Sequence, residues 1–317
     1  MTESAAAPGA RRPWRALDGI VLLDKPAGLT SNHALQRVRR LLGAAKGGHA
    51  GTLDPLATGM LPLCFGQATK ACGPLLGSRK AYRAELRLGA STSTGDAEGE
   101  VVDRQPVPPL EVAQVTAALA GFVGTIAQVP PMHSALKRDG RPLYELARRG
   151  ETVEREPRRV TIDRLESITL GADRLEFEVV CSKGTYVRVL GEDLARALGT
   201  CGHLGALRRL WVEPFDAADM VTLGTLEAWI ADGGEDPAGQ PWWLPAERAY
   251  AGLPRVDLDA AASRHLAQGR VLPPPAGVGH GGPTRAYGPD GGFLGLVEPA
   301  PGGALKALRL FVGPPEA

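Results

Sequence analysis

Two segments of this chain alternate between apolar and polar side chains residue by residue, which is the pattern of a half-buried β-strand. In residues 80–88 the apolar and aromatic positions from Tyr82 onward lie on one face, and charged side chains lie on the other. Residues 175–181 alternate in the same way. This alternation is typical of antiparallel strands, and helical segments lie between the strands. The sequence therefore predicts an α+β fold with a central mixed, mainly antiparallel sheet flanked by helices.

A capped helix is predicted just before a glycine-rich segment. Thr30 and Ser31 can cap its amino end, apolar residues recur at helical spacing, and Gly43 can end it. Residues 43–52 hold four glycines, so a loop is expected there, and it leads to Asp54. Further helices are predicted over residues 112–122, 186–198 and 258–268, and further strands over residues 19–23, 207–212, 293–298 and 304–311.

The length of 317 residues predicts more than one domain. Residues 1–16 are rich in alanine, proline and arginine and are expected to form a disordered tail. Residues 17–249 are expected to form the main domain, with a proline-rich and then highly charged extension at about 130–159 that contributes little to the core. Short strand candidates and glycine-rich turns predict a small β-rich module over residues 250–317.

Several features indicate a cytoplasmic protein. The first sixteen residues lack the apolar core of a signal peptide. No stretch of the sequence approaches the length of a membrane-spanning helix. The four cysteines follow no metal-binding spacing and are expected to be buried and reduced.

One carboxylate stands alone among many cations. Residues 25–84 contain nine lysines and arginines, and their single acidic residue is Asp54. Because the net charge of the whole chain is only +1, any surface for a polyanion must come from such local clustering. The cations would hold the polyanion, and the carboxylate would act on it. The charge pattern is equally compatible with Asp54 simply starting an Asp-Pro turn.

The sequence offers no motif for a cofactor or a metal. The glycines of residues 47–52 lack the Lys-Ser/Thr end of a phosphate-binding loop. The six histidines form no ligand cluster, and no nucleophile elbow is present. Neither a cofactor nor a metal is therefore expected. The remaining possibility is general acid, general base or nucleophilic catalysis by a carboxylate.

Residues 48–61, Gly-His-Ala-Gly-Thr-Leu-Asp-Pro-Leu-Ala-Thr-Gly-Met-Leu, resemble the signature of the TruB family of tRNA pseudouridine synthases. Four other segments resemble that family and occur in its order: residues 23–31, 94–99, 129–137 and 182–188. The resemblance covers most of the chain from residue 19 to about residue 215.

The resemblance implies a stand-alone isomerase that converts uridine 55 in the T-loop of tRNA to pseudouridine, with a flipped-out base and without a cofactor. It implies a pseudouridine-synthase fold over residues 17–249, with the active cleft running across the sheet. It implies a PUA-like RNA-binding domain over residues 250–317. The expected partner is tRNA, which the extension at 130–159 helps to bind, and the protein is expected to act as a monomer.

The resemblance also implies roles for individual residues. Asp54 matches the catalytic carboxylate, and Arg188 matches the cation that serves it. Tyr82 matches the aromatic side chain that stacks on the target base, and Tyr186 and Leu207 match positions that line the uridine pocket. From the residues alone, Arg188 is better interpreted as a helix-surface arginine, and the other three as ordinary core residues.

Two further positions and a group of cations complete the predicted site. His49 matches a residue that enters the T-loop and fills the place of the extruded base, although a histidine in a glycine-rich loop is often merely exposed. Lys25, with Pro26, matches a segment that supports the catalytic loop. The cations expected to meet RNA phosphates near this loop are Arg37, Arg39, Arg40 and Lys46.

Two other functions stay open at this point. A protein with the same scaffold could owe its role to binding or folding RNA, without catalysis. A nucleoside hydrolase could use Asp54 as a glycosidase nucleophile, and it would release free uracil and leave an abasic site. Replacement of Asp54 and identification of the product distinguish these functions from isomerisation.

Overall fold

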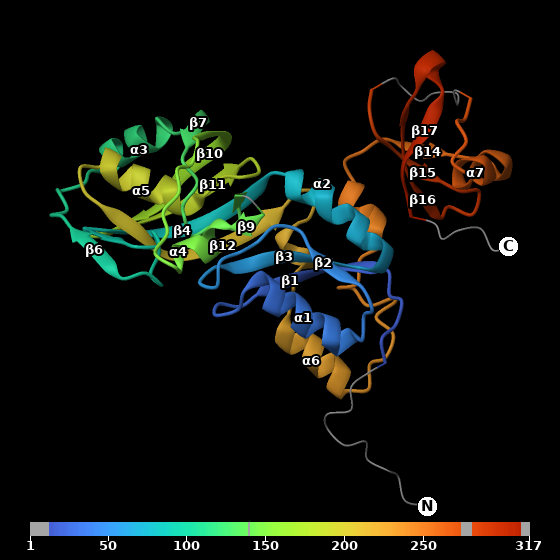
Figure 1. The fold of residues 1–317 in the computed structure, drawn as a ribbon, viewed down its shortest axis with the longest axis horizontal. Helices are drawn as coiled ribbons and strands as arrows, with labels where there is room; N and C mark the ends of the chain where they lie inside the picture. Colours follow the sequence, from blue (N-terminus) through green and yellow to red (C-terminus); the bar gives the residue numbers. More distant parts are fainter. Residues whose placement is uncertain (1–12, 139, 274–280, 312–317) are drawn as a thin grey trace, which may run out of the picture.

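The computed structural model describes residues 13–138, 140–273 and 281–311. Within them a nine-stranded sheet runs through the main body (Figure 1), in the order β13-β1-β3-β12-β4-β11-β10-β7, with β2 paired to β3 beside this path. Its strands are Gly19–Lys25 (β1), Gly47–His49 (β2), Thr58–Phe65 (β3), Lys80–Leu88 (β4), Gly124–Gln128 (β7), Arg158–Leu170 (β10), Arg174–Cys181 (β11), Gly202–Val212 (β12) and Val221–Thr222 (β13).

Most neighbours in this sheet are antiparallel. The central strand β4 pairs antiparallel with β12 on one side and with β11 on the other, which sets Tyr82 between Arg209 and Val179. Among the described strands of the sheet, only β1–β13 and β3–β12 pair in parallel. The predicted mixed, mainly antiparallel sheet is confirmed.

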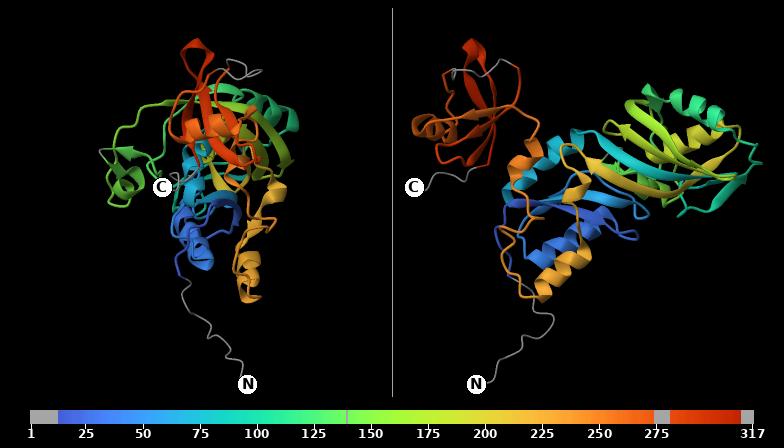
Figure 2. Two further views of the ribbon diagram at one scale, coloured as in Figure 1. Left: turned by 90° about the vertical axis from the view of Figure 1, so that its right-hand side faces the viewer. Right: turned by 180° about the vertical axis from the view of Figure 1, so that it is seen from behind.

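Helices cover the sheet in two groups (Figures 1 and 2). Helices α1 (Ser31–Leu42) and α6 (Leu223–Ala231) lie together beside β1, and α3 (Val112–Ala120) and α5 (Val187–Ala197) lie beside β10 and β12. The predicted caps of α1 are confirmed: the Thr30 side chain accepts a hydrogen bond from the backbone N–H of His33, and Gly43 adopts the left-handed conformation with φ 66°.

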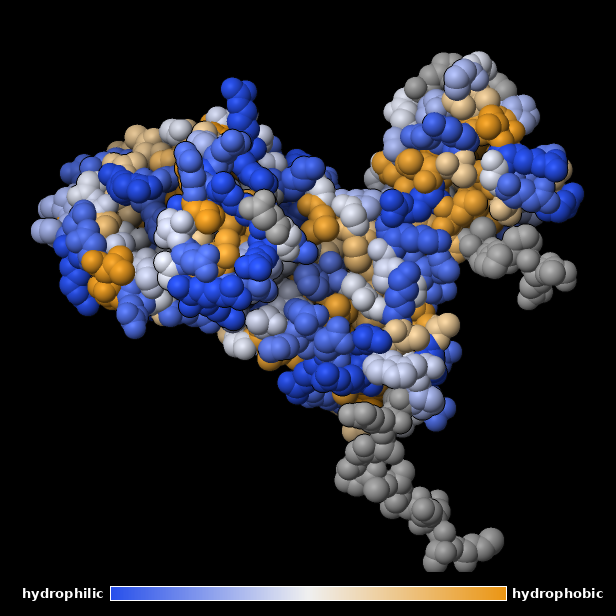
Figure 3. All heavy atoms as spheres, in the orientation of Figure 1, coloured by the Kyte–Doolittle hydropathy of each residue, from blue (hydrophilic) through white to orange (hydrophobic). Residues whose placement is uncertain are grey.

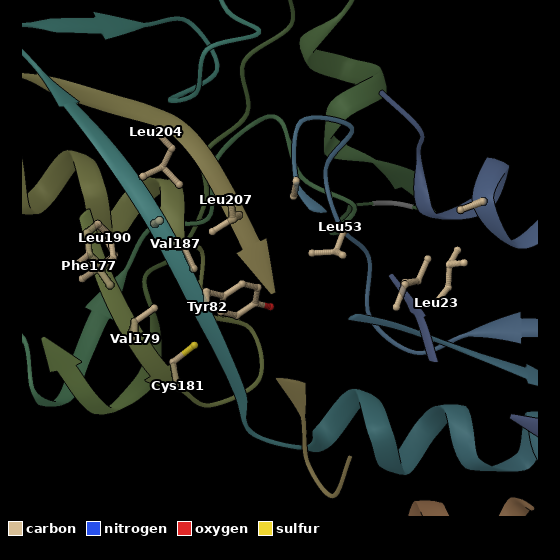
Figure 4. Packing of buried hydrophobic residues seen from close by; sticks show 14 of the residues in the cluster. Leu23, Leu53, Tyr82, Phe177, Val179, Cys181, Val187, Leu190, Leu204 and Leu207 are labelled. Carbon is tan, nitrogen blue, oxygen red and sulfur yellow. The ribbon is translucent and has the colours of Figure 1, made fainter. Parts of the chain in front are cut away.

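The main hydrophobic core lies between the sheet and these helices. Figure 4 shows part of it, with Leu190 of α5 packed near Phe177 and Val179 of β11. Tyr82 and Leu207 belong to the same core. Phe177 is fully buried, and burying a side chain of this size stabilises the fold by about 1.5–3 kcal/mol.

The sheet opens where β3 meets β12. These two strands pair over only two positions, Thr58 with Arg208 and Gly59 with Arg209. Gly59 has a φ of 95°, and a Cβ atom there would lie 2.1 Å from the Arg209 carbonyl oxygen, so this close approach requires glycine. The segment between β2 and β3, which carries Asp54, enters the sheet at this junction. The fold therefore places Asp54 where the two halves of the sheet diverge.

Two small hairpins extend from the main body. Strands β5 (Ala90–Thr92) and β6 (Val101–Arg104) form one of them, and β8 (Lys137–Arg138) and β9 (Arg141–Pro142) form the other. The second hairpin and helix α4 (Leu143–Ala147) lie in the middle of the charged extension. The extension packs more closely than predicted, because Leu143 and Leu146 are buried. These two leucines stand one helical turn apart among many charges, and so they are inconspicuous in the sequence.

A separate small β-rich unit follows Leu253 (Figure 2). Its sheet has the order β14-β15-β16-β17. Its elements are Arg255–Asp257 (β14), Ala260–Ala267 (α7), Thr284–Tyr287 (β15), Phe293–Pro299 (β16) and Leu305–Leu310 (β17). An open notch separates its upper part from the main body on the face shown in Figure 3.

The small unit contacts the main body at one joint. Tyr250 is buried in the core cluster of the main body and packs against Phe293 and Phe311. The Lys70 ammonium donates a hydrogen bond to the Leu310 carbonyl, and Arg309 donates to the Lys70 carbonyl. Lys70 lies in the 3-10 helix Gly66–Ala71, directly before α2 (Cys72–Gly77).

Three predictions about local structure need correction. Residues 47–49 lie in the expected loop but form strand β2, because they pair with residues 63–65 of β3. Strand β12 begins at Gly202, five residues before the predicted strand. The predicted disordered tail lies partly outside the described residues, but Arg15 donates its backbone N–H to the Gly43 carbonyl at 2.6 Å. Residues 13–16 are therefore attached to the main body.

Candidate active site

The loop that carries Asp54 is held from several sides. The Ser31 hydroxyl, at the start of α1, accepts a hydrogen bond from the Leu53 backbone N–H at 2.7 Å and lies 3.1 Å from the Leu53 carbonyl. The Gly28 N–H donates to the Pro55 carbonyl. Since these contacts flank Asp54 on both sides, they fix the direction of its side chain.

A buried cation supports the same loop. The Lys25 side chain is fully buried, and its ammonium donates to the carbonyls of Pro26 and Leu29 and lies 3.4 Å from that of Pro55. Burial lowers the pKa of Lys25 to about 8. Lys25 lines none of the cavities described below, so its place in the structure is that of a support beneath the loop.

Arg188 lies directly beside Asp54. One guanidinium nitrogen of Arg188 is 3.0 Å from the Asp54 carboxylate, and only 6% of the Arg188 residue is exposed. The same guanidinium donates to the backbone carbonyls of Thr94 and His133. The structure therefore brings together Asp54 and Arg188, and it ties Arg188 to two other segments. The sequence pattern alone made Arg188 a surface residue of a helix, and this interpretation is wrong.

A second acid, absent from the predicted site residues, completes this cluster. Asp96 is 3% exposed, and its carboxylate lies 3.6 Å from Nε of Arg188. It accepts hydrogen bonds from the Thr94 hydroxyl and the Glu98 backbone N–H. Arg188 is thus held between two carboxylates. The segment 94–99 contributes to the family resemblance, and that was the available signal for Asp96.

The environment of Asp54 shifts its pKa in opposing directions. Burial raises the pKa of the Asp54 carboxyl above its ordinary value, and the charge of Asp96 adds to the rise. The charge and hydrogen bond of Arg188, and the charge of Lys25, lower the same pKa. Because burial is the largest influence, the carboxyl ionises at a higher pH than an exposed aspartate does.

A cavity of about 300 Å³ opens beside Asp54, within the size range of small-ligand sites. Its walls include Tyr82, Tyr186 and Leu207, so the structure brings together the three predicted pocket residues. Figure 4 shows Tyr82 on β4 near Leu207 on β12. Tyr82 is 8% exposed. The pocket offers aromatic and aliphatic side chains to a flat ligand.

Lys80 and Arg209 also line this pocket, and neither was predicted from the sequence. Arg209 is fully buried and donates to the Met60 and Gly51 carbonyls. The Lys80 ammonium donates to the Leu76 and Ser78 carbonyls, and burial lowers its pKa to about 8. Lys80 lies on β4 and Arg209 on the neighbouring strand β12, so both reach the pocket. The sequence contains no motif that distinguishes them from other cations.

A larger groove of about 720 Å³ adjoins the other side of Asp54. Its walls include His49, Tyr144, Arg148 and residues 30–33 at the amino end of α1. His49 thus lies in this groove rather than in the pocket beside Tyr82. Its ring Nδ1 is buried and has no hydrogen-bond partner among the described residues, and burial lowers the pKa of His49.

Two of the four cations predicted to meet phosphates are used within the protein. Arg37 pairs with Glu227 of α6 at 2.5 Å. Arg39 donates to the carbonyls of Ala44 and Ala45 and stacks on Trp14. The groove is lined instead by Arg148 of the extension. The periodicity of α1 shows which residues share a face, but it does not show which partner that face meets.

The described part of the chain contains no cluster of three or more histidine, cysteine, aspartate or glutamate side chains arranged to bind a metal ion. Within the same residues, no helix combines the length and apolar character needed to cross a membrane.

The catalytic role predicted for Asp54 implies that replacement of Asp96 should change the pH dependence of catalysis. Because the charge of Asp96 raises the pKa of Asp54, Asp96→Asn should lower that pKa and extend activity to lower pH. Arg188 loses one of its two carboxylate neighbours, so we expect the maximal rate to fall about tenfold. Single-turnover rates across a range of pH measure both changes. The control is Glu100→Gln, an exposed acid of the same loop, which should change neither.

If the acid limb of the pH–rate profile stays in place in Asp96→Asn, the carboxylates of Asp54 and Asp96 are not coupled. An acid limb that moves to higher pH would contradict the sign of the effect.

Three protein-family models match nearly the whole chain. The "TruB family pseudouridylate synthase (N terminal domain)" matches residues 39–187. The "tRNA pseudouridylate synthase B C-terminal domain" matches residues 188–250, and "tRNA Pseudouridine synthase II, C terminal" matches residues 253–312. Together they cover all of the site residues described here except those before residue 39, such as Lys25.

Curated proteins match at about half of their positions. A tRNA pseudouridine synthase B of Dechloromonas aromatica is 49% identical, over 95% of this chain and 97% of its own length. One of Xanthomonas axonopodis pv. citri is 50% identical, over 95% of this chain and 96% of its own length.

Solved structures confirm the fold. A chain in the crystal structure of a Cbf5-Nop10-Gar1 complex superposes with a TM-score of 0.73 at 23% identity, covering 98% of this chain and 92% of that one. An archaeal box H/ACA sRNP Nop10-Cbf5 complex gives a TM-score of 0.70 at 22% identity, covering 97% and 94%. The family-model matches and the curated relatives lead to one conclusion: this chain belongs to the TruB family and is a pseudouridine synthase, an isomerase.

Proposed function

We propose that this protein isomerises uridine 55 in the T-loop of tRNA to pseudouridine, with Asp54 as the catalytic carboxylate and without a cofactor. One observation carries the proposal. The Asp54 carboxylate, paired with the buried Arg188, borders both an aromatic pocket suited to a base and a wide groove suited to an RNA chain. The relatives named above are tRNA pseudouridine synthases, which supports tRNA as the substrate.

The reaction needs only groups that this site contains. A C1′–N1 bond breaks, a C1′–C5 bond forms, and one proton leaves C5 while another is taken up at N1, so no electron donor or acceptor is required. Cleavage of the glycosidic bond builds positive character on the sugar, and an adjacent carboxylate stabilises that charge. Asp54 acts in its ionised form, which the charge of Arg188 favours.

The pocket suits a base that has left its stack. An enzyme cannot rearrange a base inside a folded RNA loop, so the nucleotide must swing out. Tyr82 would stack on the flat face of the uracil, with Tyr186 and Leu207 completing the pocket. His49, in the neighbouring groove, would occupy the space that the base leaves in the T-loop.

The groove and the extension would hold the RNA backbone. Arg148 lines the groove, and the extension adds further cations that would contact phosphates without reading sequence. Residues 30–33 at the amino end of α1 line the same groove, and the amino end of a helix favours anions. We expect the protein to do this work as a monomer in the cytoplasm, with tRNA as its partner.

Mapping pseudouridine in unmodified tRNA treated with the purified protein tests the proposal. We expect a single new pseudouridine, at position 55, with no free uracil and no abasic site. Release of uracil would establish a hydrolase instead. Tight binding of tRNA without any modified base would establish an RNA-binding protein.

We also propose that the small C-terminal unit is a PUA-like RNA-binding domain. Removal of residues 255–317 leaves Tyr250 in place, so the main body should stay folded. Loss of its phosphate contacts should weaken tRNA binding about tenfold or more, while some turnover at saturating tRNA remains. Affinity and single-turnover rate are measured on the same preparation, with circular dichroism as the folding check. A folded but fully inactive truncation would show that the C-terminal unit forms part of the active site.

A further inference from the structure

One buried hydroxyl in the site has no partner. Ser134 is 5% exposed, and its Oγ has no hydrogen-bond partner in the part of the chain that the structure describes. A buried hydroxyl without a partner is costly, and such groups in a binding site indicate a bond that a ligand completes. The residue Ser134 lines both the pocket beside Tyr82 and the adjoining groove.

The position of Ser134 indicates which part of a nucleotide would meet it. If the base occupies the pocket and the RNA backbone follows the groove, the ribose of the target nucleotide must lie where the two cavities join. The residues that line both cavities mark this junction: Thr52, Leu53, Asp54, Ser134, Ala135 and Arg188. The junction is also where Asp54 must lie to act on the glycosidic bond.

We propose that the Ser134 hydroxyl hydrogen-bonds to the 2′-hydroxyl of the target nucleotide and thereby distinguishes ribose from deoxyribose. This inference rests on the function proposed above. Inside an RNA chain the 2′-hydroxyl is the only free hydroxyl of each ribose, and it can both donate and accept. A serine hydroxyl has the same two abilities, so the two groups are complementary.

The other polar groups at the junction are less suited to this contact. Asp54 and Arg188 are engaged with one another at 3.0 Å, and Arg188 also donates to the Thr94 and His133 carbonyls. The Thr52 residue is exposed, so water satisfies its hydroxyl without a ligand. Among these side chains, Ser134 alone combines burial with an unpartnered hydroxyl.

Hydrogen bonds hold the backbone around Ser134 in place. The Ser134 N–H donates to the Met132 carbonyl at 2.9 Å, and the Ser134 carbonyl accepts from the Tyr144 N–H at 3.1 Å. The preceding carbonyl, of His133, accepts from Arg188 at 2.7 Å. The backbone of this segment is therefore fixed in part by the same guanidinium that pairs with Asp54, so the segment loses little freedom when RNA binds.

A thermodynamic cycle tests this contact: the affinities of two protein variants for two RNA hairpins are compared, and this comparison is called the binding cycle. Two T-loop hairpins are compared, one with uridine and one with 2′-deoxyuridine at the target position, in the Asp54→Asn background so that neither is converted. Addition of Ser134→Ala should weaken binding of the uridine hairpin about three- to tenfold, because one hydrogen bond is lost. Binding of the deoxyuridine hairpin should change by less than about twofold, because its partner atom is already absent.

Thr200 provides a matched control. Its hydroxyl is also buried and has no partner within the described ranges, but Thr200 lines neither cavity. Thr200→Val should leave the affinity for both hairpins unchanged. Equal losses for the two hairpins in Ser134→Ala, or no loss for either, would overturn the proposal, since a merely structural role cannot distinguish the two sugars.

Failure of the proposed function is detected separately. Wild-type protein is incubated with the uridine hairpin, and the product is analysed for pseudouridine. If no pseudouridine forms, the isomerase assignment fails, whatever the binding cycle shows. If pseudouridine forms and the cycle shows no coupling, only the role of Ser134 fails.

Discussion

Asp54→Asn should abolish pseudouridine formation while tRNA binding stays nearly unchanged. An amide has almost the shape of a carboxylate but no negative charge, so it cannot stabilise positive character on the sugar, form a bond to it or take up a proton. We expect the single-turnover rate to fall by on the order of 10⁴-fold or more. Arg188 keeps its neighbour Asp96, so the fold should tolerate the change. Pseudouridine mapping and filter binding, on one preparation, measure the two effects.

The matched control for Asp54→Asn is Asp103→Asn. Asp103 is an exposed aspartate on β6, and its carboxylate accepts a hydrogen bond from Gln105. This variant should retain full activity. If Asp54→Asn modified tRNA at the wild-type rate, the catalytic role of Asp54 would be excluded. If the variant lost binding and activity together, Asp54 would be a structural residue of the loop.

Arg188→Ala should reduce the rate by about 10²- to 10³-fold and change affinity for tRNA far less. The guanidinium is buried and contacts Asp54, and it lines the junction of the two cavities. Its removal also leaves Asp96 buried without a cation, and loss of one partner of a buried pair costs about 3–5 kcal/mol of stability. Thermal denaturation therefore accompanies the kinetic measurement.

The pH dependence of Arg188→Ala separates an electrostatic role from a structural one. Arg188 lowers the pKa of Asp54 through its charge and its hydrogen bond, so its removal should raise that pKa further. In the proposed mechanism activity depends on the ionised carboxylate and is lost as pH falls through this pKa. The acid limb of the rate profile should therefore move to higher pH, opposite to the movement expected for Asp96→Asn.

Two further variants complete this test. Arg188→Lys keeps the positive charge but lacks the planar guanidinium that contacts Asp54 and two backbone carbonyls at once. Compared with Arg188→Ala, it should therefore show a smaller shift of the acid limb but nearly the same loss of rate. Arg196→Ala removes an exposed arginine of the same helix and should have no effect. Equal losses of rate and affinity in Arg188→Ala would contradict the proposed pairing with Asp54.

The sequence predicts the regular parts of this fold well, because their patterns are local. The alternation across residues 80–88 and the caps of α1 each depend only on residues close together in the sequence, and both predictions are confirmed. Strand β3 is different: seven of its eight residues are buried, so it shows no alternation. The pairing of β2 with β3 depends on this strand, and it was missed for the same reason.

Site residues could be predicted from the sequence only where they belong to a family motif. Asp54 and Arg188 lie far apart in the sequence, and their contact depends on the divergence of β3 from β12 and on the start of α5. The resemblance to a family brought them together, whereas charge pattern and periodicity did not. Arg209 and Ser134 belong to no local pattern of charge or polarity that marks a site. Their importance follows from burial and from missing or unusual partners, which only a three-dimensional structure reveals.

A crystal structure of the Asp54→Asn variant bound to a T-loop hairpin tests most directly where the substrate lies. We expect the target nucleotide to be turned out of its loop, with the uracil against Tyr82, the ribose beside residue 54 and the backbone along the groove. A target base still stacked within the loop, or a ribose remote from residue 54, would contradict this account of the site.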